Sequence, residues 1–188
     1  MRAQDRPIKL RRRSSHAYSA LSLCLTWLLL LALSACERGA TKAASQDSAF
    51  KALSAKQRVL LKKVMSSYDQ LYVATQSKRL AEMQLYAGAL SEAAGSVQFS
   101  LDLESSGALA IARLSAQQIT LTRSSEEASQ QLEDLAAGLI TLSERFPSLM
   151  EGRPKRSCQL KGGGATLTWL QGRGATGQGA PYLHKSCP

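Results

Sequence analysis

The sequence predicts a mainly α-helical protein with a small β-hairpin near its C-terminus. Apolar residues recur at alternating steps of three and four along two long segments, and this spacing is typical of one helix face. Aromatic residues make up only 5% of the 188 residues, so the core must be built mostly from Leu, Ala, Val and Ile. Eight of the 13 glycines fall in residues 151–188, where short alternating segments indicate strands.

The first segment of the chain is predicted to be an export leader. A basic segment, residues 2–13, precedes an apolar run from Ala20 to Leu33, and the run ends at the small residues Ser34 and Ala35. This order is typical of a secretory signal peptide. The run is shorter than the roughly 20 residues that cross a bilayer. An uncleaved signal anchor is the alternative.

The end of the leader, Leu33-Ser34-Ala35-Cys36, closely resembles the lipobox of bacterial lipoproteins. The resemblance implies removal of residues 1–35, a diacylglyceryl thioether on the Cys36 sulfur, and usually a third acyl chain on its amine. Each buried CH₂ contributes about 0.8 kcal/mol, so these chains would anchor the protein to a membrane. Glu37, where an inner-membrane lipoprotein of enteric bacteria carries Asp, favours the outer membrane. Residues 36–47 then form a polar tether.

Residues 48–150 are expected to form a helical domain built as an antiparallel, coiled-coil-like hairpin. Its two long helices would be joined near residues 96–106, and Pro147 would end the second. Residues 36–79 carry a net charge of +6 and residues 80–150 a net charge of −6, so the helices would be complementary. The seam of the second helix at strict 3-4 spacing is Ile111, Leu114, Gln118, Leu121, Ser125, Ala128, Leu132, Leu135, Leu139, Leu142 and Phe146.

Two features of the same region leave alternatives open. Residues 97–104 and 119–123 alternate between apolar and polar side chains, which would suit an α+β fold with strands near 97–123. Ser124 and Glu127 have capping-box spacing, which would start a new helix and split the second long segment.

Residues 151–188 are expected to form a Gly-rich, basic tail module closed by a disulfide. Residues 165–170 are predicted to be a strand, with residues 182–184 as its partner. Once the leader is removed and Cys36 is acylated, Cys158 and Cys187 remain, and in an oxidising compartment they would pair. The roughly 30-residue loop would add about 3–4 kcal/mol of stability. A redox pair or two metal thiolates are the alternatives.

The tail also carries a candidate interaction patch. With it, the protein would contact a partner protein, lipid head groups or cell-wall polymer. The alternative is a solubilising tail near an anionic membrane. The basic residues of this candidate patch are Arg153, Lys155, Arg156, Lys161, Arg173 and Lys185, and its aromatic residues are Trp169 and Tyr182.

These observations favour a non-catalytic interaction or assembly factor in the bacterial envelope, as in secretion, conjugation or surface-exclusion systems. After the leader is removed, His184 is the only histidine, which disfavours histidine catalysis and metal sites, so we expect no cofactor. The modest net charge of the chain without its leader disfavours binding to nucleic acid. We expect a membrane attachment, an envelope protein partner and self-association. A small-ligand-binding or sensor lipoprotein is the alternative, and a cell-wall-acting enzyme comes third.

Overall fold

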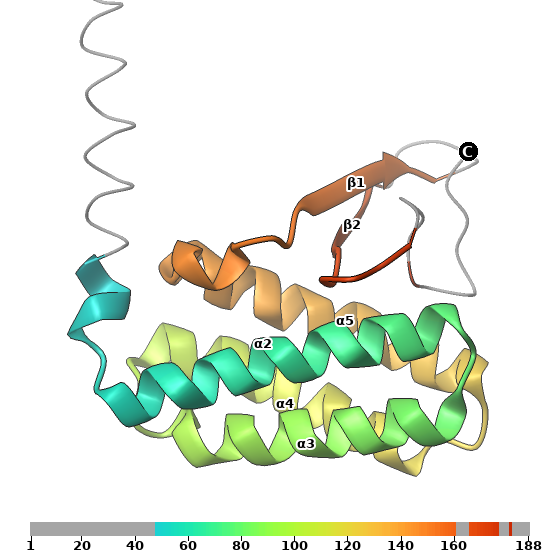
Figure 1. Ribbon diagram of the computed structural model, residues 1–188, viewed down its shortest axis with the longest axis horizontal. Helices are drawn as coiled ribbons and strands as arrows, with labels where there is room; N and C mark the ends of the chain where they lie inside the picture. Colours follow the sequence, from blue (N-terminus) through green and yellow to red (C-terminus); the bar gives the residue numbers. More distant parts are fainter. Residues whose placement is uncertain (1–47, 161–165, 177–180, 182–188) are drawn as a thin grey trace, which may run out of the picture. The chain divides into compact units, whose positions relative to one another are not determined.

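The computed structural model describes residues 48–160, 166–176 and 181. The protein is mainly helical, with a small two-stranded antiparallel sheet near the C-terminus, which confirms the predicted fold class. A helical turn over residues 48–52 precedes four long helices (Figure 1). The elements that follow this turn are α2 (Ala55–Gln76), α3 (Leu80–Gln98), α4 (Leu103–Leu121), α5 (Ser125–Arg145), the 3₁₀ helix η1 (Pro147–Met150), β1 (Lys155–Gln159) and β2 (Thr166–Leu170).

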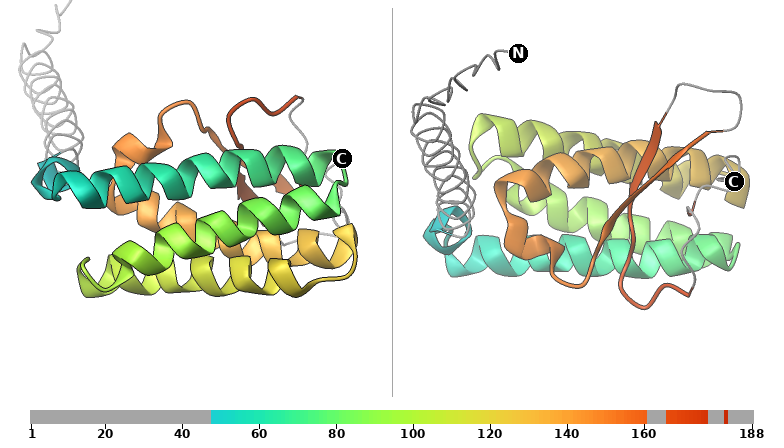
Figure 2. Two further views of the ribbon diagram at one scale, coloured as in Figure 1. Left: turned by 60° about the horizontal axis from the view of Figure 1, so that its bottom comes forward. Right: turned by 90° about the horizontal axis from the view of Figure 1, so that it is seen from above.

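The four helices form an antiparallel bundle in place of the predicted two-helix hairpin. Helices that follow one another along the chain pack side by side, and α5 returns toward α2 (Figure 2). Contacts between α2 and α5 are much sparser than those between consecutive helices. The C-terminal segment covers this open side of the bundle, because β2 packs on α5 and η1 contacts both α2 and α5.

Each predicted long helix is broken once by local capping. In the first, Lys78 adopts a left-handed backbone conformation (φ 54°), and the Arg79 N–H donates to the Ala74 carbonyl, 3.0 Å away. In the second, Ser124 caps α5 by accepting a hydrogen bond from the Glu127 N–H, 3.1 Å away. The alternative in which a new helix starts at Ser124 is therefore the one that the structure adopts, although the Glu127 carboxylate accepts from the Arg123 N–H and not from that of Ser124, so the capping box is not complete.

The strand alternative for residues 97–123 is not realised. The segment contains the end of α3, a turn and the whole of α4. The Asp102 carboxylate starts α4 by accepting hydrogen bonds from the Ser105 N–H (3.0 Å) and hydroxyl (2.8 Å). The Asp102 cap thus starts a helix in a segment whose apolar alternation alone favours a strand.

The predicted seam is buried in α5 and exposed in α4. In α5 the positions from Ala128 to Phe146 lie in the core, as the spacing predicts. Along α4 the seam prediction is wrong, because Ile111, Leu114 and Leu121 face outward. The buried face of α4 consists mainly of smaller side chains: Ser105, Ala108, Leu109, Ala112, Ser115, Ala116 and Ile119.

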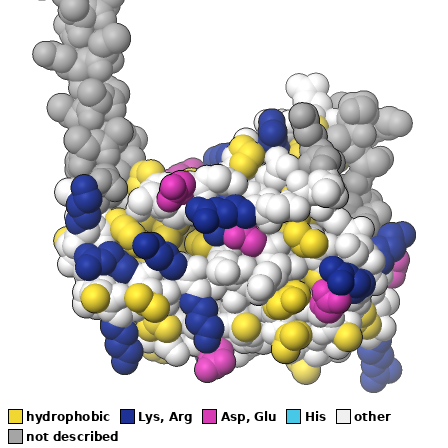
Figure 3. Space-filling view, in the orientation of Figure 1, with side chains coloured by type: hydrophobic (Ala, Val, Ile, Leu, Met, Phe, Trp, Pro, Cys, Tyr) yellow, Lys and Arg dark blue, Asp and Glu magenta, His cyan; other side chains and the backbone are white. Residues whose placement is uncertain are grey.

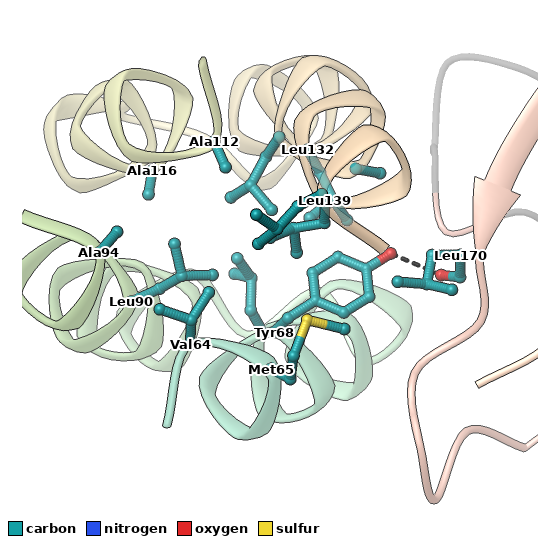
Figure 4. Packing of buried hydrophobic residues seen from close by; sticks show 14 of the residues in the cluster. Val64, Met65, Tyr68, Leu90, Ala94, Ala112, Ala116, Leu132, Leu139 and Leu170 are labelled. Atoms are coloured by element: carbon teal, nitrogen blue, oxygen red, sulfur yellow. Dashed lines mark hydrogen bonds between the residues drawn. The ribbon is translucent and has the colours of Figure 1, made fainter. Parts of the chain in front are cut away.

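Close approach of α4 to α5 explains this choice of face. A Cβ built on Gly138 of α5 would lie 2.7 Å from the Ala108 carbonyl oxygen and 2.9 Å from the Ala112 nitrogen. Helices this close have room only for small residues between them. Figure 4 shows Ala112 and Ala116 on this side of the core, and larger side chains, including Leu132 and Leu139, on the side of α2 and α5.

The C-terminal hairpin shares the core of the bundle. β1 pairs antiparallel with β2, and Cys158 lies opposite Leu167. Strand β2 matches the predicted strand, but its observed partner is β1, whereas the predicted partner, residues 182–184, lies outside the described residues. Trp169 and Leu170 are buried, and the Tyr68 hydroxyl donates to the Leu170 carbonyl at 2.5 Å (Figure 4). The described residues of the hairpin and of the four helices accordingly belong to one compact unit.

Candidate functional site

Arg153, which begins the predicted basic patch, is an internal residue. Its side chain is 6% exposed and forms a bidentate ion pair with Asp69 of α2, with Nε–Oδ1 at 2.8 Å and Nη2–Oδ2 at 2.5 Å. Its Nη1 also donates to the Leu149 carbonyl at 2.9 Å. Burial with three hydrogen-bonded nitrogens removes Arg153 from any surface that a partner reaches, which corrects the sequence-based expectation.

Arg173 completes the same cluster from the segment after β2. Its backbone N–H donates to Asp69 Oδ1 at 2.9 Å, and its guanidinium donates to the Glu151 carbonyl. The preceding Gly172 lies so close to α2 that a Cβ there would be 2.8 Å from Tyr72 Cβ. Asp69, which the sequence analysis did not single out, therefore ties two separate parts of the C-terminal segment to α2.

Lys155 and Arg156 of the predicted patch lie on β1 and have partners within the chain. Lys155 pairs with Glu144 at 3.5 Å, with both side chains at least half exposed, and Arg156 donates to Gln171 Oε1 at 3.0 Å. Trp169 is 3% exposed, because it lies on the inward face of β2, so it is a core residue and not an exposed aromatic contact. Lys161, Tyr182, Lys185, Cys187 and the lipidation site Cys36 lie outside the described residues.

Tyr72 lies beneath the same C-terminal segment. Burial raises the pKa of its hydroxyl to about 12, and interactions with the Trp169 side chain and the Arg156 charge offset part of this shift. The ring also packs edge-on against Tyr68, with centroids 6.1 Å apart. This environment stabilises a neutral phenol and gives Tyr72 a structural role.

A cleft of about 470 Å³ opens beside the Asp69–Arg153 pair, and Figure 3 shows a hollow with apolar and charged side chains at its edge on this face. Its walls combine apolar surface from Met65 and Leu149 with hydroxyl and charged groups. Among the described residues, no group of three or more His, Cys, Asp or Glu side chains is placed to hold a metal ion. The lining residues are Lys62, Met65, Ser66, Asp69, Ser148, Leu149, Glu151, Arg153 and Arg173.

Among the described residues, four of the seven exposed large apolar side chains lie on the outward face of α4. Leu103 is 92% exposed, Leu121 74%, Leu114 58% and Ile111 52%. No charged residue belongs to this row, and the Arg113 guanidinium is directed to Gln98 Oε1 of α3 at 3.1 Å. We call the row the α4 stripe; it comprises Leu103, Gly107, Ile111, Leu114, Gln118 and Leu121, all of them exposed.

An exposed apolar row of this length marks a site of association in soluble domains, whereas single exposed leucines need no explanation. Within the described residues, α4 packs on α3 and α5, and neither covers the stripe. The 3-4 spacing includes Ile111, Leu114, Gln118 and Leu121 of the stripe in a periodic seam, but not Leu103 or Gly107. It assigned these four to the core because a second, smaller-residue row on α4 was not weighed.

Comparisons with known proteins give no match. No family model, no curated protein and no solved structure matches the chain. None of the described helices is both long enough and apolar enough to cross a membrane.

Proposed function

We propose that this protein is a lipid-anchored component of the bacterial envelope that acts as a non-catalytic interaction or assembly factor. The observation that carries the proposal is the α4 stripe. The leader and Cys36 support the anchoring part, because they resemble a lipoprotein signal, with Glu37 favouring the outer membrane over the inner membrane.

The stripe is not needed for the bundle's own core. The opposite face of α4 already fills that core, with Leu109 and Ile119 fully buried. Burying a leucine side chain is worth about 1.5–3 kcal/mol. Binding of a partner that covers Leu103, Leu114 and Leu121 would therefore be stabilised by the burial of side chains that are exposed in the isolated domain.

A protein partner fits this surface better than a lipid surface. Helices that lie in the membrane interface carry many Lys and Arg residues on their polar face. Along its whole length α4 has one basic residue, Arg113, which is directed to Gln98. The uncharged stripe therefore suits the apolar face of another helix.

Capture from cross-linked membranes tests the proposal with matched variants. We expect full-length tagged protein to retain a defined protein partner, and Leu114→Glu to lose it, because a charge in the stripe opposes apolar burial. Val59→Glu, at a 65% exposed position on α2, is the control and should retain the partner. Equal recovery with Leu114→Glu and Val59→Glu would argue against the role of the stripe.

The cleft beside Asp69 favours a second candidate function, the binding of a small ligand. Its volume lies within the range of ligand pockets. Asp69 and Arg153 neutralise each other, and Lys62, Arg173 and Glu151 together leave the lining with a net charge of +1. This charge and the Ser66 and Ser148 hydroxyls would suit a small acidic molecule with an apolar part. Octanoate should then raise the melting temperature of the parent protein and not of Lys62→Gln; equal shifts would contradict this candidate. The enzyme alternative rests on His184, which lies outside the described residues.

A further inference from the structure

We infer that the outward side of α2 rests on the anionic surface of the membrane to which the lipid anchor attaches the protein. We call this surface the α2 basic face; it comprises the exposed lysines Lys51, Lys56, Lys62 and Lys63. The inference rests on the proposed function, since it needs the lipid anchor at Cys36. The charge of α2, the fold around it and the length of the tether each support it.

The start of α2 is strongly basic. From Ser48 to Tyr68 the chain has five basic residues and no Asp or Glu. Successive residues of an α-helix turn by 100°, so Lys56, Lys62 and Lys63 fall within an arc of about 120°. The ion pairs formed among the described residues involve other side chains than these three. Figure 3 shows Lys and Arg side chains gathered on the side where α2 begins.

Arg58 holds the turn that precedes α2 against the helix. Its Nη1 donates hydrogen bonds to the carbonyl oxygens of Lys51, 2.7 Å away, and Leu53, 2.9 Å away. Ser54 caps α2 by accepting a hydrogen bond from the Gln57 N–H at 3.2 Å. These bonds keep Lys51 beside the start of the helix, so its charge adds to that of the lysines on α2.

Acidic groups on the neighbouring elements offset only part of this charge. Glu92 lies on the half of α3 that packs beside the start of α2, and Glu151 lines the cleft together with Lys62. Against the five basic residues these two acids leave a net charge of +3 on this side. Asp69 lies farther along α2 and is neutralised by Arg153. The remaining positive charge suits an anionic lipid surface.

The tether makes the membrane the nearest such surface. Twelve residue steps separate the predicted lipidation site Cys36 from Ser48, so the chain between them reaches at most about 40 Å. Lys63 is about 12 Å along the helix axis from Ala55, where α2 begins. The α2 basic face therefore lies at the end of the domain that the tether joins. Because the anchor would hold the domain at the membrane, even a weak contact there would be highly populated.

Contact through α2 leaves the α4 stripe open to a protein partner. Both α2 and α4 pack on α3, and they lie on opposite sides of the bundle (Figure 2). The acidic residues at the start of α4, Asp102 and Glu104, are thus on the side away from α2. One side of the domain would meet lipid, and the opposite side would meet protein.

Quenching of a fluorophore by lipid head groups tests the contact in the full chain, purified with its lipid anchor and reconstituted in vesicles. Val59→Cys places the fluorophore among the lysines of the α2 basic face, and Leu85→Cys on α3 is the matched control, because both positions are 65% exposed. The parent chain measures labelling of the native cysteines. With phosphatidylglycerol present, nitroxide-labelled head groups should quench position 59 and not position 85. With phosphatidylcholine alone, or at high salt, quenching at position 59 should fall to the control level.

Substitution of the lysines tests the role of their charge. In a chain with Lys56→Gln and Lys63→Gln, the ratio of docked to undocked protein should fall about fivefold for each lysine replaced. Lys78→Gln, at the other end of α2, is the control and should dock like the parent. Equal docking of the parent and the double variant would overturn the inference.

The other outcomes separate this inference from the proposed function. Equal quenching at positions 59 and 85, no quenching at either, or equal quenching at position 59 with and without phosphatidylglycerol would overturn the membrane contact. In each case, capture of a protein partner by the parent and not by Leu114→Glu would leave the proposed function standing. A Cys36 without acyl groups, measured by mass spectrometry, would overturn the anchor and this inference together.

Discussion

Arg153 and Asp69 are separated by 84 residues in the chain, yet their side chains form one bidentate ion pair. From the sequence alone, basic residues in a Gly-rich tail predict a solvated surface patch. No sequence motif near Arg153 indicates that a carboxylate 84 residues away will pair with it. The pair is nearly buried, so its role is to hold the C-terminal segment on α2. The sequence shows that residue 153 is basic, but only the tertiary structure shows that its partner is Asp69.

Removing Asp69 should therefore be costly. Asp69→Ala leaves the Arg153 guanidinium buried without its counter-charge, which lowers the free energy of unfolding by about 3–5 kcal/mol. Denaturant unfolding measures this change. Glu82→Ala is the control, because Glu82 forms an exposed pair with Arg79 that is worth less than about 1 kcal/mol. Similar losses in both variants would contradict a special role for the buried pair.

Tyr72 predicts a loss of stability at alkaline pH. The unfolded chain ionises its phenol near the ordinary pKa of 10.0, whereas the folded protein holds the proton until about pH 12. Stability from this group is thus complete below pH 10 and is lost as the pH rises toward 12, by about 2–3 kcal/mol. Unfolding curves across this range should fall more steeply for the parent than for Tyr72→Phe. Parallel pH profiles would contradict the assigned pKa.

The helical segments could be predicted from the sequence, but only one of the two breaks between them could. The Ser124–Glu127 spacing predicts the start of α5, and Ser124 does cap that helix. No comparable sequence motif predicts the break at Lys78, because a lysine rarely adopts the left-handed backbone conformation that Lys78 has in this turn. The seam illustrates a second limit: periodicity identifies an apolar face, but it does not say which of two faces on α4 turns inward.

The choice of face on α4 depends on its close approach to α5, and this can be tested. Gly138→Ala would place a methyl group within 3 Å of the α4 backbone, and such overpacking costs about 1–3 kcal/mol of stability. Gly107→Ala is the matched helix glycine, with no atom within 4 Å of its added Cβ, and should stabilise by about 0.5–1 kcal/mol. Thermal unfolding of both variants measures these changes in stability. A loss of stability in Gly107→Ala, or no loss in Gly138→Ala, would contradict the role of the close approach.

At the scale of the whole molecule, the C-terminal segment serves as the cover of the bundle's open side. Leu167, Trp169 and Leu170 belong to the same core as the helices, so the described residues of the hairpin are part of the folded domain. The sequence predicts the hairpin but not its docking, because docking depends on Asp69, Tyr68 and the close approach at Gly172.

The predicted Cys158–Cys187 disulfide would fasten this cover. Mass spectrometry of unreduced peptides should show the two cysteines joined, and Cys187→Ser should lower the free energy of unfolding by about 3–4 kcal/mol. Cys158→Ser should have the same effect, and the double substitution should add little. Rapid alkylation of both thiols in the unreduced, folded protein would contradict the pairing.

We propose that a membrane-anchored domain uses the α4 stripe to bind protein. Site-specific photo-cross-linking in cells tests it most directly, with a photoreactive residue in place of Gln118 and, as the control, in place of the exposed Lys63 on α2. We predict that irradiation yields a discrete protein adduct in the membrane fraction from position 118 and none from position 63. No adduct from position 118, or the same adducts from both positions, would contradict the claim.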